Sequence, residues 1–274
     1  MGFTLNTKKQ VYDLDKKTLI MGILNVTPDS FSDGGKFSDL EKAVEQAAAM
    51  ERDGADIIDI GGESTRPGHD PVSEREELER VLPVIKKLSS VLTIPISIDT
   101  YKAEVARQAV EAGADIINDV WAAKRDAKMA EVAASLNVPI ILMHNRANTE
   151  YQNLIVDMKE DLKESITIAK EAGVREENII LDPGIGFAKN HDDNLVVMRH
   201  LDSFQELNYP MLLATSRKRF IGQILDLPAE ERMEGTGATV CLGISKGVHM
   251  VRVHDVKPVA RMAKMMDAMV GKGE

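Results

Sequence analysis

Short aliphatic runs alternate with amphipathic, charged runs along the whole chain. Three stretches show the alternation most clearly: ERDGADIIDIGG at 51–62, EAGADIINDV at 111–120 and EAGVREENIILDPG at 171–184. In each, a charged amphipathic run stops at a glycine, and a short aliphatic run then ends in Asp or Asn. This order predicts a helix, a glycine cap and a buried strand.

Five further aliphatic runs resemble the strand half of this unit, which makes eight candidate strands. They are LIMGILN (19–25), IPISID (94–99), VPIILMH (138–144), YPMLLATS (209–216) and MVRVHD (250–255). Between them, runs such as EKAVEQAAAMERD and KAEVARQAVEA carry apolar residues at helical spacing. Ser73 and Glu76 form a capping-box pattern before another such run. Apolar strands that alternate with helices indicate a parallel sheet covered by helices.

An eightfold alternation without a linker-like change in composition favours one closed α/β fold over two doubly wound domains. We therefore expect a single (β/α)8 TIM barrel spanning residues 19–274. Residues 1–18 precede the first barrel strand. We expect them to form a short N-terminal hairpin that covers the bottom of the barrel.

Polar residues stand at the end of nearly every predicted strand. They are Asn25, Asp59, Asp99, Asn118, His144, Asp182, Ser216 with Lys218, and Arg252 with His254. A lone Asp at a strand end is often only a loop cap. In a parallel barrel, however, all these ends meet at one mouth, where each unpaired buried polar group costs about 1–3 kcal/mol. The set therefore predicts a ligand or water at the barrel mouth.

The basic residues near the last two strands indicate an anion site. The run SRKRFIGQIL predicts a helix with Ser216 near its N-cap and with Lys218 and Arg219 in its first turn. Cations there oppose the helix dipole but favour a bound anion, and a solvated basic turn is the alternative. Arg252 and His254 share one face of the last strand because side chains alternate along a strand.

The acidic and amide residues on strands three, four and six suit a different group. Asp99, Asn118 and Asp182 can hydrogen-bond to a flat nitrogen heterocycle with an amidine-like edge. Metal ligation by Asp99 and Asp182 is the alternative, although no His-x-His or Asp-x-Asp spacing supports a protein cage. Together, the two halves of the mouth predict a ligand with a polar ring and an anionic tail.

Composition narrows the class of protein. The 274 residues carry a formal net charge of −10, which argues against nucleic-acid and anionic-membrane partners. No apolar segment is long enough to span a bilayer. The single cysteine, Cys241, rules out an internal disulfide and a Cys-based zinc site. A reducing, cytoplasmic location is expected.

Eight motifs make a family resemblance visible. They are NVTPDSFSDGG, GGESTRPG, ISIDTYK, IINDV, LMHNR, LDPGIGFAK, SRKRFIG and RVHDV. In order and barrel position they resemble the dihydropteroate synthases, folate-pathway enzymes that sulfonamides inhibit, from Thr18 to Val270. The resemblance implies condensation of 6-hydroxymethyl-7,8-dihydropterin pyrophosphate with p-aminobenzoate, assisted by Mg²⁺, in a protein that is commonly a homodimer.

The resemblance also implies a role for each site residue. Asp99, Asn118 and Asp182 would read the pterin edge, with Lys218 at its carbonyl and Met143, Phe187 and Arg252 lining the pocket. Asn25, Thr65, Arg66, Arg252 and His254 would surround the pyrophosphate, with Mg²⁺ near Asn25, and Pro67 would also bind substrate. The stretch VTPDSFSDGG would be a closing flap, with Asp29 near the metal and Phe31 over p-aminobenzoate. Asp99, Lys218, Arg252, Asp29 and Phe31 would act in catalysis.

Two positions depart from the family pattern. Ala214 stands where Gly is usual, and Arg219 stands where a Ser usually contacts the p-aminobenzoate carboxylate. Arg219 could bind that carboxylate through its guanidinium fork, or it could crowd the pocket, so the response to sulfonamides is open. Two other functions remain: a pterin-binding domain that transfers methyl groups to a corrinoid protein, and a pterin-binding protein without catalysis.

Overall fold

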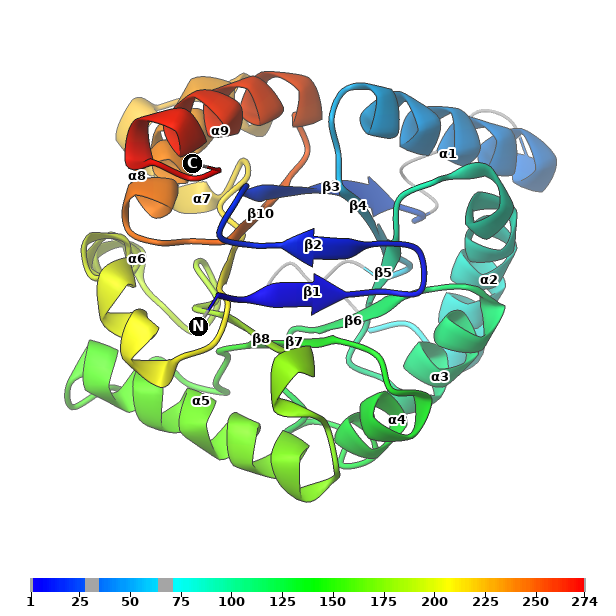
Figure 1. Cartoon of the computed structure of the whole chain (residues 1–274), viewed down its shortest axis with the longest axis horizontal. Helices are drawn as coiled ribbons and strands as arrows, with labels where there is room; N and C mark the ends of the chain where they lie inside the picture. The colour runs from blue at the N-terminus through cyan, green and yellow to red at the C-terminus, as the bar shows by residue number, and fades with distance from the viewer. Residues whose placement is uncertain (1, 28–34, 64–70, 274) are drawn as a thin grey trace.

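The computed structural model describes residues 2–27, 35–63 and 71–273. Helices form a ring around a barrel of parallel strands, and a two-stranded hairpin crosses one end of it (Figure 1). The described part of the chain contains no helix long and apolar enough to cross a membrane.

All eight predicted barrel strands are present. They are β3 (Leu19–Asn25), β4 (Ile57–Gly61), β5 (Ile96–Asp99), β6 (Ile116–Asp119), β7 (Ile140–Met143), β8 (Ile179–Asp182), β9 (Leu212–Leu213) and β10 (Met250–Val253). They form one sheet in the order β8-β7-β6-β5-β4-β3-β10-β9, and neighbouring strands pair in parallel fashion throughout. A single parallel bridge from Leu181 to Met211 joins β8 to the start of β9 and nearly closes the barrel. The predicted TIM-barrel fold is confirmed.

The helices follow the strands as the amphipathic runs predict. They are α1 (Gly35–Arg52), α2 (Glu74–Val91), α3 (Ala103–Ala112), α4 (Met129–Leu136), α5 (Leu154–Glu171), α6 (His191–Arg199), α7 (Arg219–Leu225), α8 (Met233–Ser245) and α9 (Val256–Val270). Short 3-10 helices span Glu176–Asn178, Leu201–Leu207 and Ala229–Glu231. Gly54, Gly113 and Gly173 have φ of 106°, 122° and 96°, a left-handed backbone that favours glycine after a helix.

The starts of helices α2 and α7 can be compared with the N-caps that the sequence predicts. At α2, the Ser73 hydroxyl accepts a hydrogen bond from the Glu76 amide at 3.2 Å, as the capping-box pattern predicts. At α7, the prediction was wrong: Lys218, not Ser216, is the N-cap. Arg217 between them has a left-handed φ of 57°, and its guanidinium pairs with Asp255 at 2.6 Å. That conformation delays the helix by two residues.

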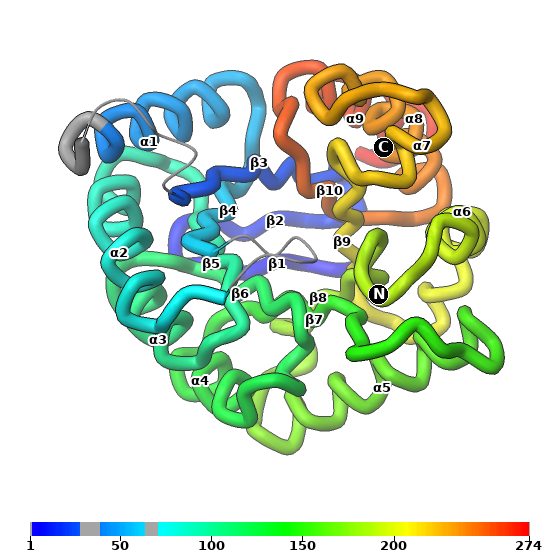
Figure 2. The backbone as a smooth tube through the Cα atoms, turned by 180° about the vertical axis from the view of Figure 1, so that it is seen from behind, coloured from blue at the N-terminus to red at the C-terminus, as the bar shows by residue number. Residues whose placement is uncertain are grey.

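The hairpin forms the floor of the barrel. Strands β1 (Thr4–Asn6) and β2 (Val11–Asp13) pair in antiparallel fashion, and Leu5 and Leu14 lie fully buried beneath the barrel. They pack against one apolar interior layer: Leu19, Met21, Ile57, Ile116, Ile141, Ile180, Leu212 and Met250. The predicted bottom cap is confirmed. Figure 2 shows the molecule from the opposite end, with the hairpin strands β1 and β2 behind the barrel.

Candidate active site

The barrel interior changes from apolar to polar within two residues on five strands. Asp59, Asp99, Asn118, Asp182 and Arg252 each stand two positions after an interior residue or its equivalent, so they face inward as well. We call these five residues the polar ring. The four acidic and amide members are at most 5% exposed. The sequence predicted four of the five as site residues, and the structure brings all five together.

Arg252 is the centre of the polar ring. Its Nε donates to Asp59 Oδ2 at 2.5 Å, and its Nη2 donates to Asp99 Oδ2 at 2.7 Å. Asn118 Nδ2 also donates to Asp59 Oδ2, at 3.2 Å. Among the described residues, nothing hydrogen-bonds to the other two buried oxygens, Asp59 Oδ1 and Asp99 Oδ1. These two oxygens are acceptors available to a ligand.

The polar ring holds more carboxylates than cationic side chains. Burial raises the pKa of Asp99, and the neighbouring Asp59 raises it further, while Arg252 lowers it. Burial lowers the pKa of Arg252, but the two carboxylates more than offset this and hold it above its usual value. Two carboxylates therefore share one guanidinium, and the ring favours a ligand that presents N–H donors or positive charge.

Lys218 and Asp182 form a second group on the rim. Asp182 Oδ1 accepts from the Gly184 amide at 2.7 Å, and burial raises the pKa of this carboxyl. The Lys218 ammonium donates to the Ile185 carbonyl and lies 4.8 Å from the centre of the Phe187 ring. Burial lowers the pKa of Lys218 to about 8, against the opposing charge of Asp182.

The last strand continues into a basic edge. Ser216 Oγ lies 2.9 Å from His254 Nδ1 and also accepts from the His254 amide at 3.1 Å. The serine oxygen has two lone pairs, so the direction of the contact with Nδ1 follows the tautomer of the His254 ring. Arg219 is exposed, and no described residue forms a hydrogen bond or ion pair with it.

Asn25 ends β3 opposite Gly61, with which it is paired in register. A Cβ on Gly61 would lie 3.7 Å from Asn25 Oδ1 and 3.8 Å from Asp99 Oδ2, so the glycine keeps space open between them. Within the described ranges, no three His, Cys, Asp or Glu residues are arranged to hold a metal ion. A single amide oxygen fits Mg²⁺ where substrate phosphates and water complete the shell.

The two neighbours at the end of β7 point in opposite directions. Met143 lies in the interior, 3% exposed and in register with Asp182. His144, the next residue, points out of the barrel toward α5 and pairs with Asp161, so its expected place on the mouth was wrong. Alternation along the strand explains this, because only one of two neighbours can face inward.

The predicted flap and part of the predicted pyrophosphate site fall on residues that the structure does not describe. Asp29, Phe31, Thr65, Arg66 and Pro67 lie outside the described residues.

Sequence reasoning gave no role to two residues of this region. Asp59 was counted among the strand ends, but its link to Arg252 was not foreseen. The signal was present, since Asp59 follows the interior residue Ile57 at the same spacing as Asn118 follows Ile116. Lys189, in the LDPGIGFAK motif, was not singled out, and no local pattern marks it as buried.

The comparisons with known proteins agree with this geometry. Residues 21–254 match the family described as pterin binding enzyme. The chain is 66% identical to the dihydropteroate synthase of Bacillus subtilis, over 98% of this chain and 94% of that protein. It is 59% identical to the dihydropteroate synthase of Clostridium beijerinckii, over 94% and 97% of the two chains.

Solved structures show the same likeness. A dihydropteroate synthase from Clostridium difficile, crystallised in the presence of pteroic acid, has a TM-score of 0.93 at 51% identity and covers 94% of this chain and 98% of its own. The Xanthomonas albilineans enzyme with 4-aminobenzoic acid has a TM-score of 0.93 at 39% identity, over 98% of both chains. The chain therefore belongs to the pterin-binding enzymes, among the dihydropteroate synthases, transferases of folate biosynthesis.

Proposed function

We propose that this chain condenses 6-hydroxymethyl-7,8-dihydropterin pyrophosphate with p-aminobenzoate to give 7,8-dihydropteroate and pyrophosphate. The observation that supports this most is the polar ring, with two buried carboxylate oxygens that have no described partner. Relatives solved with pteroic acid and with 4-aminobenzoic acid support the same substrates.

The pterin ring would lie against the polar ring. Its amidine-like edge supplies N–H donors, which the free oxygens of Asp59 and Asp99 and the carboxylate of Asp182 can accept. Asn118 supplies both a donor and an acceptor. Lys218 would donate to the pterin carbonyl. Met143 and the Phe187 ring would line the pocket beside it, together with Arg252.

The pyrophosphate would lie toward the basic edge. Arg252 and His254 would contact it from β10, and Thr65, Arg66 and Pro67 would do so from the β4–α2 connection. Asn25 would hold Mg²⁺, which would supply positive charge that neutralises the phosphate oxygens. The amide oxygen of Asn25 and the space kept by Gly61 suit that shared ion.

The chain's part in the reaction is electrostatic. The bond between the pterin methylene carbon and the pyrophosphate oxygen breaks, and its electron pair leaves with pyrophosphate. The cation that remains is delocalised into the pterin ring, where the Asp99 carboxylate stabilises it. The amine of p-aminobenzoate then forms the new C–N bond and loses a proton to solvent. Asp29 and Phe31 would close over the site and exclude water from the cation.

Arg219 would bind the carboxylate of p-aminobenzoate. Its guanidinium lacks a partner among the described residues and offers a fork that matches a carboxylate. A Yersinia pestis relative, 37% identical with a TM-score of 0.91, is solved with a sulfonamide drug. We propose that this chain is also a sulfonamide target, with an affinity that depends on Arg219 and on the buried Ala214.

We also propose a cytoplasmic homodimer. Helices α7, α8 and α9 lie together on one side of the barrel (Figure 1). Large apolar side chains are exposed on these helices. These are Ile224, Leu225, Leu242, Met265, Met269 and Val270. A second copy of the chain would cover them.

Light scattering should give about twice the chain mass, and Met265→Glu should reduce the measured mass to that of one chain. Val156→Glu, on α5, should leave the mass unchanged.

The direct test of the function is pyrophosphate release. The protein is incubated with the dihydropterin pyrophosphate, Mg²⁺ and p-aminobenzoate. Release that requires both p-aminobenzoate and Mg²⁺ supports the proposal. Tight pterin binding without release would instead indicate a non-catalytic pterin-binding protein. Loss of p-aminobenzoate use in Phe31→Ala, with pterin binding retained, would support the flap.

A further inference from the structure

The loop from β8 to α6 has an unusual backbone. Gly184, Gly186 and Ala188 have left-handed φ of 66°, 84° and 47°, so its carbonyls are not paired in a regular ladder. Side chains supply donors instead. Lys189 donates to Gly184 O at 3.0 Å and to Phe187 O at 2.9 Å. Lys218 donates to Ile185 O. Lysine ammonium groups thus help to fix the shape of the loop.

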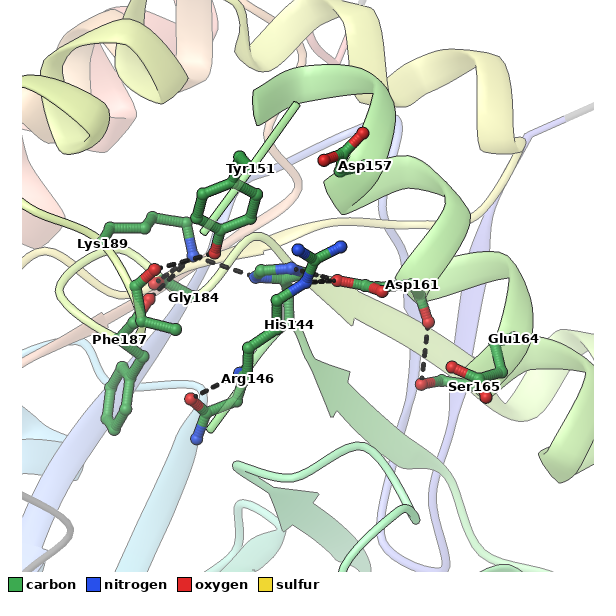
Figure 3. A network of polar contacts seen from close by, with 12 residues as sticks. His144, Arg146, Tyr151, Asp157, Asp161, Glu164, Ser165, Gly184, Phe187 and Lys189 are labelled. Carbon is green, nitrogen blue, oxygen red and sulfur yellow. Dashed lines mark hydrogen bonds and ion pairs between the residues drawn. The ribbon is translucent and has the colours of Figure 1, made fainter. Parts of the chain in front are cut away.

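Lys189 uses all three of its N–H donors inside the protein. The third goes to His144 Nδ1 at 2.9 Å, and Figure 3 shows the ammonium between that ring and the two carbonyls. His144 Nε2 lies 2.9 Å from Asp161 Oδ2, which places the ring proton on Nε2 and leaves Nδ1 as the acceptor. Burial lowers the pKa of His144 to about 4, which keeps the ring neutral.

The position of Lys189 is costly. Its residue is 9% exposed, and no carboxylate among the described residues pairs with it. Burial lowers the pKa of Lys189 to about 7, which shows that keeping its ammonium charged among these neutral acceptors costs free energy. Stability alone is therefore a poor reason for its presence, which points to a role in the neighbouring site.

We propose that Lys189 is a positioning residue for the pterin pocket. By holding the carbonyls of Gly184 and Phe187, it fixes the turn that carries the Phe187 ring. The same turn presents Ile185 O to Lys218, whose ammonium lies 4.8 Å from that ring. Lys189 thus sets two pocket groups without touching the substrate. This inference rests on the proposed function, which places Phe187 and Lys218 against the pterin.

The test compares Lys189→Met with Lys189→Gln and with Lys163→Met. The Met variant keeps an unbranched side chain that is one atom shorter and removes the donors, and the Gln variant has the same length as Met and offers two N–H donors. Lys163, on the exposed face of α5, is the matched control, with 56% of its side chain exposed. Measured quantities are the KM of each substrate, kcat, and the dissociation constant of the dihydropterin pyrophosphate without p-aminobenzoate.

For Lys189→Met we expect the dihydropterin KM and dissociation constant to rise by about tenfold to a hundredfold, because the pocket is misplaced. The p-aminobenzoate KM should change much less. Lys189→Gln should fall between Met and wild type, and Lys163→Met should match wild type. If Lys189→Met does not fold, the Gln variant carries the same comparison.

The experiment distinguishes failure of this inference from failure of the proposed function. If wild type binds and turns over but the folded Lys189 variants keep its dihydropterin constants, Lys189 has only a structural role and this inference is wrong. A uniform loss of kcat without change in either KM would contradict it equally. If wild type itself neither binds the dihydropterin pyrophosphate nor releases pyrophosphate, the proposed function fails, and this inference fails with it.

Discussion

At the scale of single residues, Arg252 supplies the positive charge that the carboxylates of the polar ring need. Its guanidinium contacts one oxygen of Asp59 and one of Asp99. Two buried carboxylates this close would repel each other and lose hydration without a cation between them. The fork of an arginine suits this role because it binds two oxygens at fixed angles, which a lysine cannot do.

Arg252→Ala should therefore reduce both stability and activity. Two buried carboxylates lose their partner, so the free energy of unfolding should fall by about 3–5 kcal/mol. Urea unfolding followed by circular dichroism measures this. Arg75→Ala removes an ion pair with Glu79 in which the Arg75 side chain is 89% exposed, and should cost less than about 1 kcal/mol. Equal urea midpoints for the two variants would contradict the role given to Arg252.

At the scale of elements, the sequence predicts strands better than it predicts loops. The eight strands were recognisable because each is an aliphatic run bounded by a helix pattern and a polar end. The inward direction of Asp99, Asn118 and Asp182 follows from alternation. The outward direction of His144 follows from the same alternation, because its neighbour Met143 faces inward. The burial of Lys189 could not be read locally, since it depends on how the β8–α6 loop packs. The α7 start failed for the same reason, through Arg217.

The N-terminal hairpin illustrates an element that supports the site without entering it. Leu5 is 1% exposed and closes the apolar layer of the barrel. Leu5→Ala should destabilise the protein by about 2–5 kcal/mol, because it leaves a cavity under the barrel. Both KM values should stay near wild type. Val11→Ala, at a position 68% exposed on the same hairpin, should change stability little. An altered dihydropterin KM in Leu5→Ala would show that the hairpin reaches the site.

At the scale of the whole molecule, buried histidines link stability to pH. Burial lowers the pKa of both His144 and His249 to about 4, from an ordinary 6.5. As the pH falls below 6.5, these two histidines bind protons in the unfolded chain but stay neutral in the folded chain. This part of the stability is therefore complete above about pH 6.5 and is lost progressively between that value and about pH 4.

His144→Gln should remove the part of this loss of stability that comes from His144. Between pH 7.5 and 5, His144 alone should account for about 2 kcal/mol of the fall in unfolding free energy. The variant should thus lose less stability over that range than wild type does. His200→Gln, at an exposed position, should behave as wild type. Identical pH profiles for all three proteins would mean that His144 is charged in the folded state.

The measurement that bears most directly on the proposed chemistry is the turnover of Asp99→Asn. Asparagine keeps the size of the side chain but removes the charge that would stabilise the pterin cation. With folding confirmed by circular dichroism, kcat should fall by at least about a hundredfold. Asp119→Asn, at the outward-facing neighbour of Asn118, should keep most of its activity. Turnover near wild type in Asp99→Asn would contradict electrostatic catalysis by the polar ring.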